Sequence, residues 1–344
     1  MKLELIQDLA HFKKVEGYWK KLYSQSSHMP FLSYEWTNSW IANSKINQLC
    51  ILIFKDEENI AAILPLFIDS SKTLRFIGDL HADSLGILYT EDANKDMIIK
   101  VFLKFIDENK RIQKIDFRNL SKCWFSNYLF CYLKKNKFYY YDTASSEIYL
   151  EQSEDFFDSF RRYKGLQSEL KRISKKFVNS GSSIYMNSNN DRFPLDLIKT
   201  LNQQMIESNA RNPKYFSEIM INVCQALYLS DMLFVHEFHN ENSTIALNLF
   251  LKNNNTYQLW IDLYSNIPYA NIASYISLIN ELKLVNNKEQ TTINFGRGLY
   301  KYKLKNFRPY IIPLKRLVYA KSFLSFVIQS LNIQFKIILK AFFK

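Results

Sequence analysis

The clearest pattern of apolar and polar positions lies between residues 232 and 303. Three apolar or alternating runs follow one another with asparagine-rich turns between them, which is typical of a meander of antiparallel strands. The third run leads into a stretch with helical spacing and then into another short run, which predicts a strand–helix–strand crossover. The predicted elements are strands Leu233–His239, Thr244–Lys252 and Thr256–Tyr264, a helix Tyr269–Leu284 and a strand Thr291–Phe295.

The first half of the chain repeats this order of elements. Short apolar runs between residues 49 and 89 predict a meander, and the next stretches predict a helix at Lys95–Asn109 and a strand at Lys114–Arg118. A chain of 344 residues is long enough for two hydrophobic cores. We therefore expect an α/β (α+β) fold of two tandem domains with mixed sheets, residues 1–150 and 151–312, followed by a tail at residues 313–344.

The tail combines a wide apolar face with positive charge. From Ser322 to Lys344 the polar residues recur at steps of three and four, which places them on one stripe of a helix. The residues after Glu289 include eleven of the 45 basic and none of the 33 acidic residues, so residues 1–289 hold 34 basic and 33 acidic residues, a net charge of +1. Such a basic amphipathic helix favours an anionic membrane surface as partner. The alternative is a terminal helix that packs on its own domain or in a dimer.

Other features limit location and partners. Residues Met1–Asp8 carry acids where a signal peptide needs an apolar run, and no window reaches 18 uninterrupted apolar residues. The four cysteines have no metal-binding spacing and lie in apolar surroundings, which predicts buried, reduced thiols and no metal. The nearly neutral body does not favour a nucleic-acid binder. We expect a cytoplasmic protein, peripheral on the inner face of the cytoplasmic membrane.

Five segments resemble, in the same order, the motifs of the CelD/BcsL-type acetyltransferases of bacterial exopolysaccharide loci, relatives of the Fem-type aminoacyl transferases. They are Pro30–Trp36, Ala61–Leu66, Phe76–Gly78 followed by Asp83, the basic stretch Arg161–Arg172 before Gly181, and Asn294–Gly298 followed by Tyr302 and Lys303. The resemblance covers residues 30 to 305. It implies two tandem GNAT-like domains and an acyltransferase that depends on acyl-CoA, with acetyl-CoA as the expected cosubstrate.

The resemblance also implies where acyl-CoA binds. In the GNAT fold the turn between the third strand and the following helix holds the pyrophosphate of acyl-CoA. Free N–H groups and the positive end of the helix dipole form an anion site there without a cationic side chain. The residues at this turn are Tyr269, Ala270, Asn271, Ile272, Ala273 and Ser274.

Several polar residues are candidates for the chemistry. Asp262 lies on the strand that would line the transfer site, where it positions or deprotonates the acceptor amine, or simply caps the following turn. His81 and Asp83 share a loop and suit a general base pair or a clamp for a sugar. By the resemblance, Tyr302 protonates the departing thiolate, although the tyrosines there would equally serve as packing.

Basic residues are candidates for holding the acceptor. Arg297 and Lys303 would bind its phosphate or carboxylate. Arg161 and Arg162 begin a basic helix that either faces solvent or meets the diphosphate of a nucleotide sugar or lipid. We expect His81 and Asp83 to converge with Arg297 and Lys303 on one cleft.

The predicted function is an N-acyltransferase that moves an acyl group from acyl-CoA to an amino sugar of a nucleotide- or lipid-linked surface polysaccharide precursor. One alternative is a Fem-like aminoacyl transferase that uses charged tRNA. A second is a non-catalytic, membrane-associated partner of a polysaccharide synthase. It is favoured by Asn294, where the family usually has Asp, and by the lack of glycine at residues 269–274.

Overall fold

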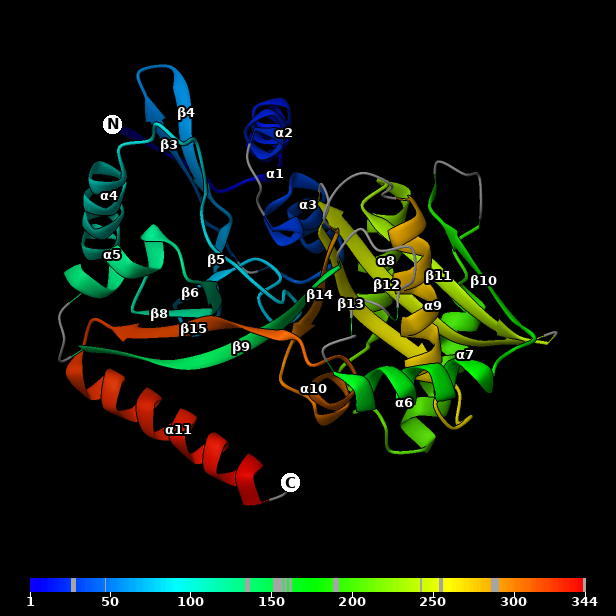
Figure 1. Ribbon diagram of the computed structural model, residues 1–344. Coiled ribbons are helices and arrows are strands. Elements are labelled where there is room, and N and C mark those ends of the chain that lie inside the picture. The colour runs from blue at the N-terminus through cyan, green and yellow to red at the C-terminus, as the bar shows by residue number, and fades with distance from the viewer. Residues whose placement is uncertain are drawn as a thin grey trace. The chain divides into compact units, whose positions relative to one another are not determined.

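The computed structural model describes residues 1–25, 29–46, 48–133, 137–150, 157, 160, 163–187, 192–241, 243–253, 256–285 and 291–342. The chain divides into two compact units (Figure 1). Unit 1 comprises Met1–Ala144 and Pro313–Lys344, and unit 2 comprises Ser145–Ile312. Both units combine helices with a mixed sheet.

Unit 2 contains the predicted meander and crossover. Its strand order is β10-β11-β12-β13-β14-β9, antiparallel throughout except for the parallel pair β13 and β14. The strands are β10 (Ser180–Tyr185), β11 (Leu233–Asn240), β12 (Ser243–Asn253), β13 (Thr256–Tyr264), β14 (Thr291–Arg297) and the second half of β9 (Phe138–Leu150). Helix α9 (Ala270–Val285) connects β13 to β14, so the predicted strand–helix–strand unit is confirmed.

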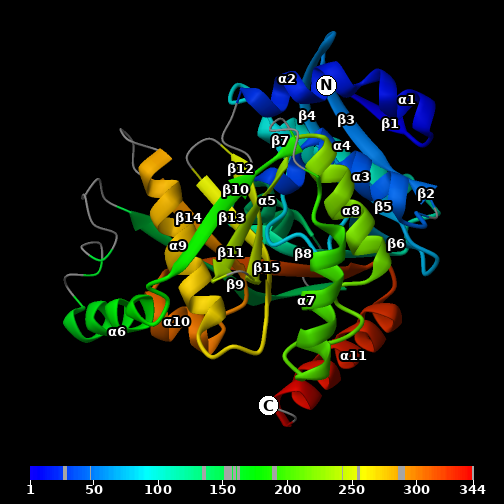
Figure 2. The same ribbon diagram turned by 90° about the vertical axis from the view of Figure 1, so that its right-hand side faces the viewer.

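Helices cover both faces of this sheet because most of its side chains are apolar on both sides. In β12, seven consecutive residues from Ile245 to Leu251 are buried, which a strand exposed on one face would not allow. Helices α6, α9 and α10 lie on one face, and α7 and α8 lie on the other (Figure 2). Their bounds are α6 (Lys164–Lys175), α7 (Leu195–Glu207), α8 (Glu218–Leu229) and α10 (Lys301–Phe307).

Unit 1 contains two sheets. The first is antiparallel in the order β1-β3-β4-β7, and the second is mixed in the order β15-β8-β6-β5-β2, with β6 and β8 parallel. The strands are β1 (Lys2–Ile6), β3 (Ile51–Asp56), β4 (Asn59–Leu64), β7 (Leu88–Tyr89), β15 (Tyr310–Ala320), β8 (Lys114–Ser121), β6 (Thr73–Phe76), β5 (Leu66–Ile68) and β2 (Gln48–Leu49). The helices are α1 (Leu9–Lys14), α2 (Glu16–Ser24), α3 (Tyr34–Asn43), α4 (Lys95–Glu108), α5 (Trp124–Tyr132) and α11 (Phe323–Phe342).

Two sequence-based expectations need correction here. Residues 313–320 were expected in the helical tail but lie in β15, which pairs antiparallel with β8, so α11 begins only at Phe323. The reason is burial, because Leu317, Val318 and Ala320 complete the core of unit 1. The thiols were expected to be buried, but Cys131 is exposed. Within the described residues, no helix is long and apolar enough to cross a membrane.

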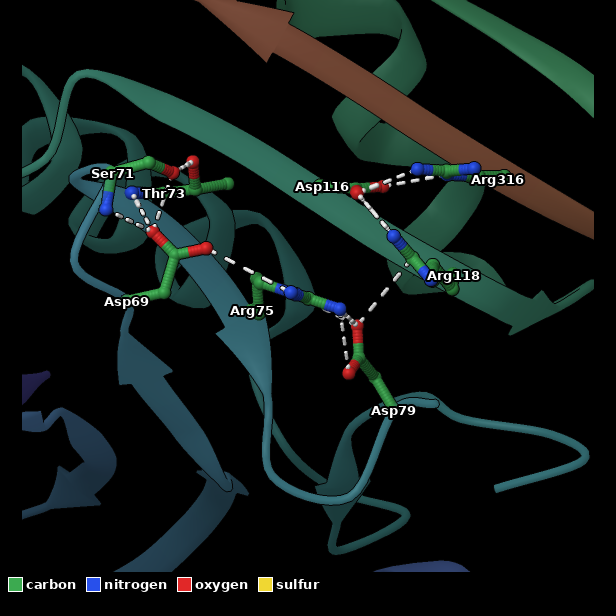
Figure 3. Close-up of polar contacts among 8 residues, drawn as sticks. All are labelled: Asp69, Ser71, Thr73, Arg75, Asp79, Asp116, Arg118 and Arg316. Carbon is green, nitrogen blue, oxygen red and sulfur yellow. Dashed lines mark hydrogen bonds and ion pairs between the residues drawn. The ribbon is translucent and has the colours of Figure 1, made fainter. Parts of the chain in front are cut away.

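A chain of ion pairs fastens β15 to the rest of unit 1 (Figure 3). It runs in the order Asp69, Arg75, Asp79, Arg118, Asp116, Arg316. Arg316 Nη2 and Nε each lie 2.6 Å from a carboxylate oxygen of the buried Asp116. Burial alone would raise the pKa of Asp116, but the hydrogen bonds and charge of Arg316, with the charge of Arg118, lower it. The C-terminal strand is therefore held by a paired, buried charge as well as by its backbone ladder.

Candidate functional site

Strands β13 and β14 form a fork in unit 2. They are parallel but pair only over Thr256–Gln258 and Thr292–Asn294, although β13 continues to Tyr264. A β-bulge follows, because Leu249 faces Ile261 and Phe250 faces Leu259, which leaves Trp260 as an extra residue. In the described part of the chain, β13 beyond Gln258 therefore has no strand partner on this side. An open strand edge of this kind can pair with an extended ligand.

Asn294 closes the base of the fork. Its Oδ1 accepts hydrogen bonds from Ser145 Oγ (2.9 Å), Gln258 Nε2 (3.1 Å) and the backbone N–H of Gly296 (2.8 Å). Its Nδ2 donates to Glu147 Oε1 at 2.6 Å. The side chain thus links three neighbouring strands, β9, β13 and β14, at the last rung of the parallel ladder. An asparagine is suited to this position because a carboxylate could not donate to Glu147.

The segment Asn294–Gly298 at the end of β14 contains two glycines with positive φ, Gly296 and Gly298. Gly298 has φ +95°, and a Cβ there would lie 2.7 Å from the Tyr300 ring. Lys303 is buried, donates from Nζ to the Phe295 carbonyl and lies 5.2 Å from the centroid of the Tyr300 ring. Arg297 ends β14 at the same loop. Their proposed contact with the acceptor stays a prediction.

The predicted cofactor turn lies at the start of α9, and three of its backbone N–H groups already donate hydrogen bonds within the protein. The N–H of Ala270 donates to the Ile267 carbonyl (3.1 Å), and the N–H of Ala273 donates to the Tyr269 carbonyl (2.9 Å). The N–H of Ile272 donates to Asn271 Oδ1 at 2.9 Å. Tyr269 adopts φ +70°, which is costly for a tyrosine. These three N–H groups are therefore not free for a pyrophosphate, and the binding of acyl-CoA at this turn stays a prediction.

Side-chain cations supply positive charge at the same turn. Arg172 Cζ lies 5.5 Å and Lys176 Nζ lies 4.5 Å from the centroid of the Tyr269 ring. Both come from the α6 segment, and Arg172 also pairs with Glu169 at 2.7 Å. The residues present thus fit a pyrophosphate through Arg172, Lys176 and the dipole of α9 rather than through a main-chain cradle.

Ser274, the last residue of the predicted turn, is buried in a polar trio beneath α9. Its hydroxyl donates to Asn248 Oδ1 on β12, which also accepts from His236 Nδ1 on β11 at 3.0 Å. Burial lowers the pKa of His236 from its usual 6.5 to about 4. Ser274 therefore connects α9 to the sheet, and because it is buried it is not available to ligands that approach from solvent.

Asp262 lies on β13 beyond the fork, next to an arginine that the sequence did not single out. Its carbonyl accepts a hydrogen bond from Arg211 Nη2, in the loop between α7 and α8. Arg211 Cζ lies 5.5 Å from the Tyr215 ring and 5.7 Å from the Phe216 ring. Its Nη1 is buried and has no hydrogen-bond partner within the described residues. A buried guanidinium nitrogen in this state suits an incoming oxyanion.

The charges of Asp262 and Arg211 also act on Tyr264, the last residue of β13. Burial raises the pKa of Tyr264, the charge of Asp262 raises it further and the charge of Arg211 opposes the shift. Asp262, Tyr264 and Arg211 therefore interact electrostatically on the open part of the fork. The only sequence signal for Arg211 was a basic residue in a polar loop between two helices.

The remaining predicted residues divide between the two units. In unit 1, His81 stacks on Trp40 with ring centroids 5.2 Å apart and 18° between the planes, and Asp83 is buried. Their loop is shaped by tryptophan packing, since a Cβ on Gly78 would lie 2.7 Å from Trp40. Tyr302 lies in α10 of unit 2, whereas Arg161 and Arg162 lie outside the described residues. The convergence of these residues on one cleft stays a prediction.

A cavity in unit 1 lies apart from the residues discussed above. It measures about 750 Å³ and is lined by α2, the turn between β3 and β4, and the segment after β7. None of the predicted site residues lines it.

No family model and no curated protein sequence matches the chain, but solved structures do. The DUF2156 C-terminal domain of a putative lysylphosphatidylglycerol synthetase from Agrobacterium fabrum has a TM-score of 0.59 at 10% identity, covering 93% of this chain and 95% of that one. FemX has a TM-score of 0.57 at 12% identity, with coverages of 92% and 97%. A tandem GNAT protein from the clavulanic acid biosynthesis pathway has a TM-score of 0.52 at 7% identity, with coverages of 93% and 99%.

At these identities the similarity establishes the fold alone. The chain has a mixed α/β fold that is similar to the folds of FemX and of the tandem GNAT protein. Families and substrates are not assigned by this similarity.

Proposed function

We propose that this protein is an N-acyltransferase that moves an acyl group from acyl-CoA to an amine. The observation that carries the proposal is the fork between β13 and β14 within a GNAT-like fold. The pantetheine arm of acyl-CoA is an extended chain with amide groups, which suits the unpaired edge of β13. Its pyrophosphate would be held by Arg172 and Lys176 at the start of α9.

The reaction follows from this placement of the donor. The amine nitrogen attacks the thioester carbon, the C–N bond forms, and the C–S bond breaks as the thiolate leaves. A backbone N–H beside the bulge at Trp260 would stabilise the oxyanion of the tetrahedral intermediate. Asp262 would position the amine or accept its proton, and Tyr302 would return a proton to the thiolate.

We propose an amino sugar on a nucleotide- or lipid-linked surface polysaccharide precursor as the acceptor. The ordered motifs shared with the exopolysaccharide acetyltransferases support this choice. The buried Nη1 of Arg211 supports it independently, because such precursors carry phosphate oxygens close to the sugar. Arg297, Lys303, Arg161 and Arg162 are further proposed contacts for these phosphates, and His81 with Asp83 for the sugar.

A second candidate is aminoacyl transfer from charged tRNA. It is favoured by the similarity to FemX and to the lysylphosphatidylglycerol synthetase domain. The net charge of +1 over residues 1–289 speaks against it, because a tRNA is bound mainly through its phosphates.

Mass spectrometry and calorimetry test the two candidates together. Purified protein is incubated with acetyl-CoA and a panel of nucleotide-linked amino sugars, and separately with aminoacyl-tRNA. A sugar product with a mass increase of one acetyl group supports the proposal. Transfer from aminoacyl-tRNA alone would replace it with the second candidate. The absence of binding heat with both acetyl-CoA and desulfo-CoA would contradict acyl-CoA dependence and favour a non-catalytic partner of a polysaccharide synthase.

A further inference from the structure

Helix α11 carries a row of exposed apolar side chains. From Leu324 onward the row advances by steps of four, three and four residues, which aligns it along one side of a helix. Its members are Phe323, Leu324, Ile328, Leu331 and Phe335, which are 57%, 68%, 52%, 59% and 61% exposed. Among the described side chains of α11, only Ile333 is buried. A helix whose function was to pack on its own unit would bury this row rather than present it.

The positive charge of the α11 segment favours an anionic partner for this row. Lys321 precedes α11, Lys336 and Lys340 lie within it, and no acidic residue follows Glu289. A second copy of the chain would bring two acid-free, positively charged helices together, which costs electrostatic free energy. An anionic bilayer offers opposite charge and an apolar interior at the same time.

We propose that α11 lies in the surface plane of an anionic lipid bilayer, with the row Phe323–Phe335 inserted among the acyl chains. The attachment of α11 to unit 1 supports a docked rather than a loosely tethered helix. Lys321 Nζ donates to the carbonyls of Asp107 (3.2 Å) and Asn109 (2.9 Å), directly before the helix begins. Strand β15 immediately before it is paired with β8. This inference concerns the membrane only and does not depend on the proposed reaction.

Liposome flotation of the intact protein tests this proposal. The vesicles are phosphatidylcholine alone, or phosphatidylcholine mixed with phosphatidylglycerol. We expect flotation with the anionic vesicles, weakened by salt but not abolished, because the apolar contribution is not screened. The double variant Leu324→Glu, Leu331→Glu should lower vesicle partitioning at least roughly tenfold, because two inserted apolar side chains are replaced by charged ones.

The control places the same charges on equally exposed apolar positions of unit 2. Val178 and Leu229 are 81% and 60% exposed, and the variant Val178→Glu, Leu229→Glu should float like the wild type. Circular dichroism of both variants confirms that the fold is intact. Equal flotation of the Leu324→Glu, Leu331→Glu variant and the wild type would overturn the proposal. It would also be overturned if the wild type did not float and light scattering showed a dimer that this variant dissociates, because α11 would then be an interface between copies.

Discussion

The side-chain amide of Asn294 donates a hydrogen bond of 2.6 Å to Glu147, at the rung where the pairing of β13 and β14 ends. The two residues are far apart in sequence, and each lies on a different strand of unit 2. Because Asn294 Oδ1 also accepts three hydrogen bonds, this one side chain determines where the fork begins. The asparagine supplies both the acceptor and the donor that these contacts use, which a carboxylate could not do.

Replacing Asn294 by Asp should lower the free energy of unfolding by about 2 kcal/mol. Two carboxylates would then face each other at the place where the Asn294 amide now donates a hydrogen bond to Glu147. The loss should shrink at acidic pH, where one carboxyl group takes up a proton and can donate again. Urea unfolding at several pH values measures this effect. The double variant Asn294→Asp, Glu147→Gln restores a donor and should recover most of the stability. Unchanged stability of Asn294→Asp would contradict the role assigned to this side chain.

His236 should make the stability of the protein depend on pH. Its pKa is lowered to about 4 in the folded protein, so between pH 6.5 and 4 the unfolded chain binds a proton that the folded chain does not. The free energy of unfolding therefore rises with pH across this window, and about 3 kcal/mol is lost as the pH falls through it. The variant His236→Gln should lack this part of the slope in urea titrations. A slope that is unchanged in His236→Gln would refute the prediction.

Acyl-CoA affinity should depend on Arg172 and Lys176. The double variant Arg172→Ala, Lys176→Ala removes both cations from the turn before α9 and should weaken binding roughly tenfold or more. Lys171 is the matched control, because it lies on the same helix but 5.5 Å from the Phe157 ring instead of the Tyr269 ring. Isothermal calorimetry with acetyl-CoA measures the loss, and dephospho-CoA, which lacks only the 3′-phosphate, should show the same loss if the two cations hold the pyrophosphate. If the Lys171→Ala variant loses as much affinity as the double variant, the cations act through general charge only.

Turnover should depend on Asp262. The variant Asp262→Asn keeps the side-chain shape and should lower kcat about a hundredfold, with acetyl-CoA affinity unchanged, if the carboxylate positions or deprotonates the amine. The exposed Asp196→Asn on α7 serves as the control. Steady-state kinetics over a range of pH separates the two roles, because loss of a base also removes the rise in rate with pH on the acidic side of the profile. Full activity of Asp262→Asn would leave Asp262 as a turn-capping residue.

The sequence was informative where neighbouring segments of the chain determine structure. The meander and crossover of unit 2 follow from runs of period two, polar turns and one helical stretch, and the structure has them within a few residues of the predicted bounds. Helix α3 also begins at a local signal, since Ser33 Oγ accepts from the Trp36 N–H as an N-cap serine does.

Features that depend on distant partners were missed. Residues 313–320 were assigned to the tail and not to a strand, because the partner of β15, strand β8, lies about 200 residues earlier in the chain. The same holds for the Asn294 hydrogen bonds to Ser145 and Glu147. Arg211 was missed because its significance comes from the end of β13, which loop composition does not reveal. Local patterns specify elements, whereas such contacts arise only once those elements are assembled.

The discontinuity of unit 1 affects how the chain can fold while it is being synthesised. Its N-terminal part ends at Ala144, but the strand that supplies Arg316 to Asp116 emerges only after all of unit 2. Domains usually fold in order from the N-terminus as the ribosome releases them. Here the nascent N-terminal segment must wait with an open sheet edge and with Asp116 still lacking Arg316, whereas unit 2 has its complete sequence first. Unit 2 should therefore complete its folding before unit 1 does. A ribosome stalled just before β15 should expose a protease-sensitive N-terminal segment.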